Sequence, residues 1–389
     1  MRRLKLQPFS VKLLALPLVA LMAASCIQDE ALNTEADIEH ITLPGDVLNR
    51  DAEFGDAIYE ADGTPVYPII LYLKKGTDIV RLAPELKLTP GATVEPPSGT
   101  PRNFRTPQYY TVTSEDGKWQ RRYRIEVSST SAIGTFYHFE DVRLGGGGKY
   151  HIFYETDDKG EERLAWSSAN PGYALTDINV KTPEQFPTYQ WSEGKSGKCV
   201  KLVTLKTGSL GSSVNMPIAS GNLFLGTFNV GNALTNALKA TQFGLQYENV
   251  PTYLRGWYKY RSGDTFYELD KTAKDKLKPI PGRKDVFNIY AVFYENTDDN
   301  RLLDGTNVLA EDNEQIISTA VIDKARETDE WTEFYLPFIY RPGKSIDPVK
   351  LASGGYNLTI VFASSLRGDY FEGAPGSTLL VDEVELGYE

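Results

Sequence analysis

The sequence predicts an all-β protein in which a small β-sandwich is followed by a larger β-sandwich of the jelly-roll type. Strand-like runs separated by turn residues recur along most of the chain, and helical stretches are few. The aromatic content comes mainly from 23 Tyr and 17 Phe, and the 22 Pro and 33 Gly are spread between the runs. This mixture favours short strands joined by turns over helices.

The first 37 residues predict export and attachment to a membrane. A basic start is followed by an apolar run at residues 13–24, and small residues then lead to Cys26. This pattern is typical of a lipoprotein signal peptide, so we expect residues 1–25 to be removed and Cys26 to carry lipid. The alternative is an ordinary cleaved signal with an unmodified cysteine. Residues 26–37 are polar and are expected to form a tether.

Residues 27–30 form an acidic tetrapeptide directly after Cys26. It resembles the surface-export signal of lipoproteins in glycan-foraging Gram-negative bacteria. We therefore expect an outer membrane lipoprotein, with display at the cell surface favoured over the periplasmic face. A solvated linker would have the same composition.

Charge and cysteine content exclude several classes of function. The 41 basic and 52 acidic residues and the pI near 5.0 argue against a nucleic acid or an anionic membrane surface as the partner, since both require clustered Lys and Arg. If Cys26 is lipidated, Cys199 has no partner for a disulfide, and we expect a small buried hydrophobe there. The three histidines have no metal-ligand spacing, and no GxSxG nucleophile motif is present.

The first sandwich is predicted at residues 38–128. A strong hairpin signal, Asp116-Gly117, lies between two of its strands. Its strand candidates are residues 66–73, 86–88, 109–113 and 121–127. Residues 129–135 are mostly small and polar, which predicts a linker.

The remaining residues, 136–389, are predicted to form two packed antiparallel sheets, most economically a jelly roll. The strand candidates are residues 201–205, 223–228, 253–260, 287–294, 334–340, 356–363 and 378–386. One short helix is expected at residues 233–240, because Leu234 and Leu238 would share a face.

Two groups of motifs resemble known families. Residues 364–386, 253–260 and 331–338 are similar to the putative carbohydrate-metabolism domain of Bacteroides-type lipoproteins, and this resemblance covers residues 136–388. It implies a jelly roll like those of carbohydrate-binding modules and a glycan partner, and it brings no established catalytic residues. Residues 88–94, 97–100, 110–117 and 123–127 resemble the immunoglobulin-like modules near the start of many such lipoproteins, which mostly act as spacers.

A structural calcium ion is a further expectation from this resemblance. Carbohydrate-binding jelly rolls often clamp their first and last strands with Ca²⁺, and Glu140 and Asp382 could supply the charged oxygens. The alternative is that both acids lie on the outward side of alternating strands. No cofactor beyond this ion is expected.

Aromatic and polar side chains on two strands predict where sugar would bind. Alternation places Trp257 and Arg255 on one face of their strand. The neighbouring strand candidate would pack Phe287, Ile289, Ala291 and Phe293 in the core, which leaves Asn288 and Tyr290 on its other face. We expect Trp257, Tyr290 and Arg255 to form one sugar-binding platform on the concave sheet. Tyr370 lies in a Gly-rich loop that could border the groove.

Three functions stay open from the sequence. The leading hypothesis is a non-catalytic lipoprotein that binds polysaccharide or oligosaccharide for a glycan-utilisation system, with outer-membrane glycan-uptake proteins as possible partners. The second is a glycoside hydrolase, for which Glu268, Asp270, Glu333 and Asp369 are candidate acids. The third is a structural or adhesive envelope subunit.

Overall fold

The computed structural model describes residues 32–45, 47–48, 52–60, 62–73, 77–128, 133–156, 162–176, 179–233, 235–297 and 302–389. The predicted signal peptide, Cys26, part of the tether and part of the linker lie outside the described residues. In the described ranges, no helix has the length and apolar character needed to cross a membrane. Strands predominate, which confirms the predicted all-β class.

The first β unit, within residues 32–128, contains two sheets. One has the strand order β2-β4-β8-β7-β6, in which β3 also pairs with β4, and the other joins β1 to β5. β4 and β8 are parallel, whereas the other pairs are antiparallel. The strand bounds are β1 (Ile38–Thr42), β2 (Glu53–Phe54), β3 (Ile58–Tyr59), β4 (Pro65–Tyr72), β5 (Glu85–Leu88), β6 (Thr93–Glu95), β7 (Gln108–Thr113) and β8 (Gln120–Ser128).

Apolar side chains from both of these sheets form one hydrophobic core. Ile41 of β1 and Leu86 of β5 contribute to it from one side, and Tyr110 and Ile125 contribute from the other. The predicted hairpin joins β7 to β8 through Gly117, whose φ of 69° is in the region that favours glycine.

The second β unit, within residues 133–389, is built on two facing sheets that we call sheet I and sheet II. Sheet I has the order β13-β14-β30-β21-β27 with β9 beside β30. Sheet II has the order β17-β29-β24-β26-β28 with β20 beside β29. Their bounds are β9 (Phe136–Tyr137), β13 (Thr188–Trp191), β14 (Cys199–Val203), β17 (Asn222–Phe224), β20 (Leu245–Gln246), β21 (Pro251–Arg261), β24 (Asn288–Glu295), β26 (Ile316–Val321), β27 (Thr328–Pro337), β28 (Ile339–Tyr340), β29 (Tyr356–Ala363) and β30 (Thr378–Tyr388).

Smaller elements cover the edges and the outer face of this sandwich. The helices are α2 (Asn170–Thr176), α3 (Ser209–Ser213), α4 (Val230–Ala233), α5 (Ala237–Ala240) and α6 (Pro348–Ala352), with 3₁₀ turns η1 (Pro183–Gln185) and η2 (Gly368–Tyr370). The strands are β10 (Val142–Gly145), β11 (Tyr150–Thr156), β12 (Glu162–Ala165), β15 (Leu205–Lys206), β16 (Ile218–Ala219), β18 (Gly226–Phe228), β19 (Thr241–Phe243), β22 (Phe266–Leu269), β23 (Leu277–Ile280) and β25 (Leu303–Asp304).

The region predicted as one helix at residues 233–240 is two short helices. Asn236 is the N-cap of α5, so the chain leaves helical geometry between α4 and α5. Leu234, one of the two residues behind the prediction, lies outside the described residues.

The main core lies between sheet I and sheet II, and it fixes which face of each strand points outward. Leu254 and Tyr258 of β21 point into it, so Trp257 and Arg255 point away. Ile289, Ala291 and Phe293 of β24 also belong to this core, as predicted.

The other face of β24 is not open, contrary to the prediction of an exposed platform. Tyr290 and Tyr294 are buried in a second apolar cluster with Phe243 of β19 and Leu303 of β25. The reason is that the sheet β18-β19-β25 and the nearby helices fold over this side of sheet II. A strand buried on both faces is a nearly continuous apolar run, which describes β24.

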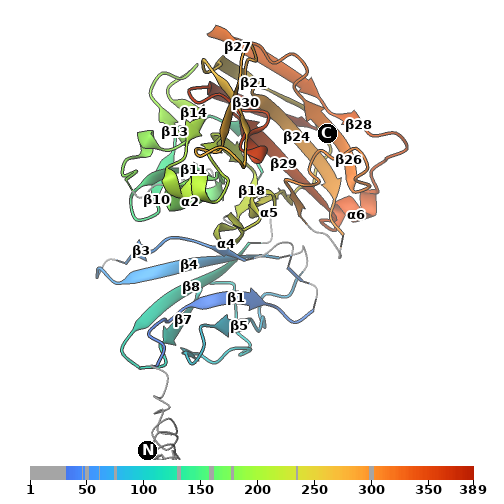
Figure 1. The fold of residues 1–389 in the computed structure, drawn as a ribbon. Helices are drawn as coiled ribbons and strands as arrows, with labels where there is room; N and C mark the ends of the chain where they lie inside the picture. The colour runs from blue at the N-terminus through green and yellow to red at the C-terminus, as the bar shows by residue number, and fades with distance from the viewer. Residues whose placement is uncertain are drawn as a thin grey trace, which may run out of the picture.

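A hydrogen bond between a backbone amide and a carboxylate joins the two β units. In Figure 1 the first unit, blue to teal, lies below the second, green to red. The amide nitrogen of Gly146, in the turn between β10 and β11, donates a 2.7 Å hydrogen bond to Oδ2 of Asp56 in the first unit.

Candidate functional site

The predicted sugar-binding residues fall into two separate places. Trp257 and Arg255 lie on the outer face of sheet I, whereas Asn288 and Tyr290 lie on the outer face of sheet II. The expected single platform is therefore wrong, because the main core separates these two faces. Tyr370 lies in η2 and joins Asn288 and Tyr290 in lining one cavity.

This cavity has a volume of about 440 Å³ and lies against the outer face of sheet II. Strands β17, β24 and β29 supply Phe224, Asn288, Tyr290 and Val361 to its lining. Helices α2, α4 and α5, strands β16, β18 and β19, the segment after β25 and the loop at residues 365–371 also contribute to the lining. A concave and largely apolar site with a few polar groups is typical of small-molecule binding.

Asn288 and Tyr290 bring unpaired polar groups into this cavity. The two residues are 8% and 6% exposed, and neither side chain forms a hydrogen bond within the described part of the chain. Burial, and to a smaller extent the charge of Asp369, raise the pKa of Tyr290 well above its ordinary value. The phenol therefore stays protonated and can donate to a ligand, while the amide can both donate and accept.

Asp369 and Tyr370 form part of the cavity rim. Asp369 is an exposed residue, yet the cavity wall removes enough water from its carboxyl group to raise the pKa to about 6. Tyr370 is 45% exposed, and the guanidinium of Arg367 lies 4.4 Å from its ring centroid. In the described residues that line the cavity, Asp369 is the only carboxylate.

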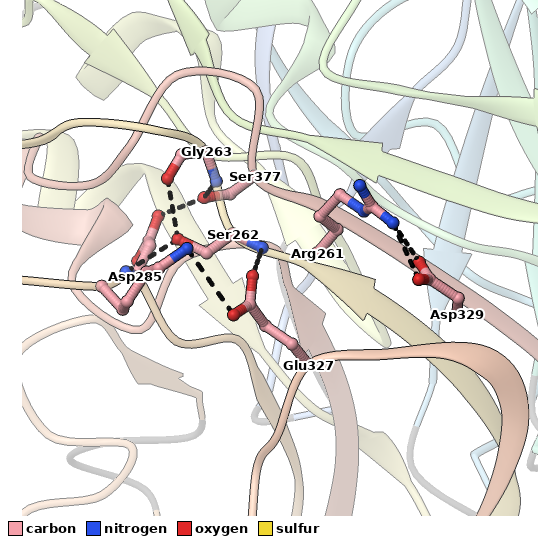
Figure 2. Close-up of polar contacts among 8 residues, drawn as sticks. Arg261, Ser262, Gly263, Asp285, Glu327, Asp329 and Ser377 are labelled. Carbon is pink, nitrogen blue, oxygen red and sulfur yellow. Dashed lines mark hydrogen bonds and ion pairs between the residues drawn. The ribbon is translucent and has the colours of Figure 1, made fainter.

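The loop that carries Asp369 is anchored on the buried carboxylate of Asp285. Oδ2 of Asp285 accepts hydrogen bonds from Oγ of Ser365 at 2.6 Å, Oγ of Ser377 at 2.7 Å and the amide of Ala374 at 2.8 Å. Figure 2 shows Asp285 and Ser377 beside Ser262, whose Oγ accepts from the amide of Asp285 at 3.0 Å. Both ends of residues 365–377 are thus tied to one side chain.

The other acids considered for hydrolysis lie elsewhere. Glu268 is in β22 and is paired with Arg283 at 2.8 Å. Asp270 accepts hydrogen bonds from Thr272 in the turn that follows β22. Glu333 is on the outer face of sheet I, opposite Trp257. None of these three lines the cavity beside Asp369.

Glu140 and Asp382 are brought to one loop, residues 194–198. The amides of Lys195 and Ser196 donate to Oδ2 of Asp382 at 2.6 and 3.0 Å, and the amide of Lys198 donates to Oε1 of Glu140 at 2.8 Å. Asp382 is fully buried, and this burial raises its pKa to about 6. No cationic side chain pairs with it in the described residues.

The structure thus partly fits the expected metal site. The two carboxylates that would bind calcium accept hydrogen bonds from the same loop, and within the described residues no cationic side chain pairs with the buried Asp382. However, no group of three or more acidic, His or Cys side chains that could hold a metal occurs within the described ranges. Further ligands would therefore have to be backbone carbonyls, neutral side-chain oxygens or water.

The contacts of Arg255 and Cys199 indicate structural roles for both residues. Nε of Arg255 donates to Oε2 of Glu385 at 2.6 Å, and the hydroxyl of Tyr253 donates to Oε1 of the same carboxylate at 2.6 Å. Cys199 is buried, as predicted, and burial raises the pKa of its thiol to about 12. Neither residue is poised for chemistry at the cavity.

Sequence reasoning missed the cavity walls. They come from small residues of the α4–α5 region, such as Ala233, Ala237 and Ala240, and from the segment after β25. The available signal was β24 itself, since a polar Asn and a Tyr in an otherwise apolar central strand require a reason.

Comparison with known families decides where the chain belongs. The family described as "Putative carbohydrate metabolism domain" matches residues 138–387. The chain is a member of that family. A second family, described as "SGBP, N-terminal", matches residues 56–127. No curated protein matches the chain.

Two solved structures support this assignment of the putative carbohydrate metabolism domain. A putative glycoside hydrolase from Bacteroides thetaiotaomicron VPI-5482 is 48% identical, with a TM-score of 0.77, and the match covers 93% of this chain and 99% of that one. A putative glycoside hydrolase from Bacteroides vulgatus ATCC 8482 is 47% identical, with a TM-score of 0.61, and the match covers 67% of this chain and 100% of that one.

All of the candidate residues in the described structure belong to the putative carbohydrate metabolism domain. The cavity residues Asn288, Tyr290 and Asp369 and the paired acids Glu140 and Asp382 fall inside residues 138–387. The first β unit contributes none of them. These findings support a role related to carbohydrate.

Proposed function

We propose that this protein binds a polysaccharide or oligosaccharide without cleaving it, and that the cavity on sheet II is the binding site. The observation that carries this proposal is the pair of buried polar side chains Asn288 and Tyr290, which have no hydrogen-bond partner among the described residues. A buried polar group without a partner is costly, so it is retained where a ligand supplies the missing hydrogen bonds.

Sugars meet the chemical demands of this cavity. Their hydroxyl groups donate and accept hydrogen bonds, as the Asn288 amide, the Tyr290 phenol and the Asp369 carboxylate require. Their C–H faces pack against aromatic rings, and Tyr370 at the rim offers one. A volume of about 440 Å³ is within the range of small-ligand sites, so we expect the cavity to hold one end or one short branch of a glycan.

Hydrolysis is the second candidate, because both similar structures are described as putative glycoside hydrolases and Asp369 has a raised pKa. Glycosidases generally use two carboxyl groups that flank the scissile bond. The described cavity lining offers one. This favours binding, and the absence of new reducing ends from any glycan that binds would support it.

The cellular setting completes the proposal. We infer that Cys26 carries lipid, that the protein is an outer membrane lipoprotein displayed at the cell surface, and that it delivers glycan to outer-membrane uptake proteins. The basic and apolar start of the sequence supports export, and the match of residues 56–127 to "SGBP, N-terminal" fits a place in the envelope. We also propose that Glu140 and Asp382 bind a structural calcium ion.

The decisive experiment measures glycan binding by residues 27–389 and by two single variants. Affinity electrophoresis against plant, host and microbial polysaccharides would find a ligand, and calorimetry would then compare Tyr290→Phe and Asn288→Ala with the parent protein. Loss of one neutral hydrogen bond should weaken binding about threefold to tenfold. Tyr290→Phe should not lower the melting temperature, because its hydroxyl has no partner in the described residues.

Tyr59→Phe is the matched control, since Tyr59 is 73% exposed and lies in the first β unit. It should bind like the parent protein. A panel with no binder, or equal affinity of Tyr290→Phe and the parent protein, would contradict the proposal.

A further inference from the structure

The outer face of sheet I carries an arrangement of aromatic and cationic residues that the cavity does not explain. Three of the five tryptophans of the chain lie on this face, and a lysine ammonium lies over each of them. We call it the tryptophan–lysine face, and its members are Trp191, Trp257, Trp331, Lys195, Lys201 and Lys259.

The contacts between these side chains are close. Nζ of Lys201 lies 3.8 Å from the ring centroid of Trp191, and Nζ of Lys195 lies 4.4 Å from that of Trp257. Nζ of Lys259 lies 5.3 Å from that of Trp331. All three distances are within the range of a cation–π interaction.

The lysines of this face lack carboxylate partners, unlike its arginines. Arg255 is paired with Glu385, and Arg261 is paired with Asp329 at 2.6 Å. In the part of the chain that the structure describes, Lys195, Lys201 and Lys259 form no ion pair. Acidic residues outnumber basic ones in this chain, whose net charge is −11. Three lysines without a carboxylate partner on one face therefore point to a function for their charge.

Strand register places Lys201 and Lys259 on the two sides of the same residue of β30. Leu380 of β30 is the neighbour of Lys201 on one side and of Lys259 on the other. The face runs from Trp191 on β13 to Trp331 on β27, across five adjacent strands. At a strand spacing of about 4.8 Å it spans roughly 19 Å, which is long enough for several linked sugar rings.

The tryptophan–lysine face is distinct from the cavity. Val200 and Leu202 alternate with Lys201 on β14 and point into the main core, as do Leu254 and Tyr258 on β21. The cavity lies on the far side of that core, against sheet II. One small ligand cannot occupy both places.

We propose that the tryptophan–lysine face binds the chain of a uronate-containing polysaccharide, in addition to the proposed cavity function. The C–H faces of pyranose rings pack on aromatic surfaces. A uronate also carries a carboxylate at its ring edge, and an ammonium group beside an indole can pair with it. A neutral sugar could accept hydrogen bonds from these ammonium groups but would not neutralise their charge, which is why the charge favours an acidic polymer.

The test compares one polymer in two chemical forms. Binding of residues 27–389 to polygalacturonate is measured beside polygalacturonate whose carboxyl groups have been reduced to alcohols, at about 20 and 150 mM salt. We expect binding to the acidic form that weakens as salt rises, and little binding to the reduced form. The variant Lys201→Gln/Lys259→Gln should lose about threefold to tenfold in affinity, and Lys201→Arg/Lys259→Arg should keep most of it.

Lys274→Gln is the control, because Lys274 is exposed in the turn between β22 and β23, away from this face. Equal binding of the acidic and reduced polymers, or unchanged affinity of the double Gln variant, would overturn the proposal. Preference for a sulfated polymer over polygalacturonate would also overturn it.

The tests of the tryptophan–lysine face and of the cavity can be told apart. Tyr290→Phe should leave polygalacturonate binding unchanged, and the double Gln variant should leave binding of a cavity ligand unchanged. Failure of one proposal therefore does not imply failure of the other.

Discussion

At the scale of single residues, Asp369 distinguishes binding from catalysis. Its carboxyl group is the only one in the described cavity lining, and desolvation raises its pKa to about 6. Above pH 6 the group is a carboxylate and accepts strong hydrogen bonds from sugar hydroxyls. Below pH 6 it becomes a neutral acid, which is the form that a general acid in hydrolysis needs.

The two functions therefore predict opposite pH dependence. For binding, we expect the affinity of the parent protein for its cavity ligand to fall several-fold from pH 7.5 to pH 5, and that of Asp369→Asn to be lower at pH 7.5 and nearly flat. Calorimetry at matched ionic strength measures both. An affinity for the parent protein that does not change with pH, or cleavage that increases as pH falls through 6, would argue against a carboxylate that only binds.

At the scale of elements, the loop at residues 365–377 is positioned by Asp285. Both oxygens of this buried carboxylate accept hydrogen bonds, because Oδ1 bonds the amide of Val286 while Oδ2 bonds three donors of the loop. An amide at this position would point its NH₂ group at one of these donors. The side chain of Asn has the same shape as that of Asp, but it could not accept all of the hydrogen bonds that Asp285 accepts.

Asp285→Asn should therefore destabilise the protein and disturb the cavity together. We expect a loss of about 1–3 kcal/mol in the free energy of unfolding, the cost of a buried polar group left without its partner. Binding of the cavity ligand should weaken as well, since Asp369 and Tyr370 lie in the same loop. Asp312→Asn, at an exposed position, is the control for denaturant unfolding and calorimetry. A variant as stable as the parent protein would show that Asp285 does not hold the loop.

The sequence predicted strands better than the site. Period-two alternation located β4, β7, β21, β29 and β30 within a few residues, because each has one face in a core. It also identified the inward face of β24. Alternation cannot tell which elements cover the other face of a strand, so the α4–α5 region that closes the cavity was not foreseen. For the same reason Trp257 and Tyr290, which belong to different sheets, were expected to lie together.

At the scale of the whole molecule, Glu140 and Asp382 link the beginning and the end of the second β unit. β9 pairs with β30, Glu140 follows β9, and Asp382 lies within β30. Both carboxylates accept hydrogen bonds from the loop at residues 194–198. Lys195 of this loop also lies over Trp257. An ion at this point would fasten three distant segments and support the tryptophan–lysine face at once.

Asp382 sets the expected dependence on pH and calcium. Its pKa rises from 3.8 to about 6 on folding, so ionising it in the folded state costs about 3 kcal/mol. Between these pH values the unfolded chain binds fewer protons than the folded one, and the free energy of unfolding falls as pH rises. Bound calcium would neutralise the ionised carboxylate, so its benefit should be large at pH 7 and small at pH 5.

We therefore expect calcium to raise the melting temperature at pH 7 by about 5–10 °C relative to EDTA, for an ion at roughly 100 times its dissociation constant. Magnesium should do much less, because it binds poorly to irregular sites of protein oxygens. Asp382→Asn should abolish the calcium effect, and scanning calorimetry at pH 5 and pH 7 measures each case. Equal melting temperatures in calcium and EDTA at pH 7 would mean that the amides of residues 195, 196 and 198 satisfy these carboxylates without an ion.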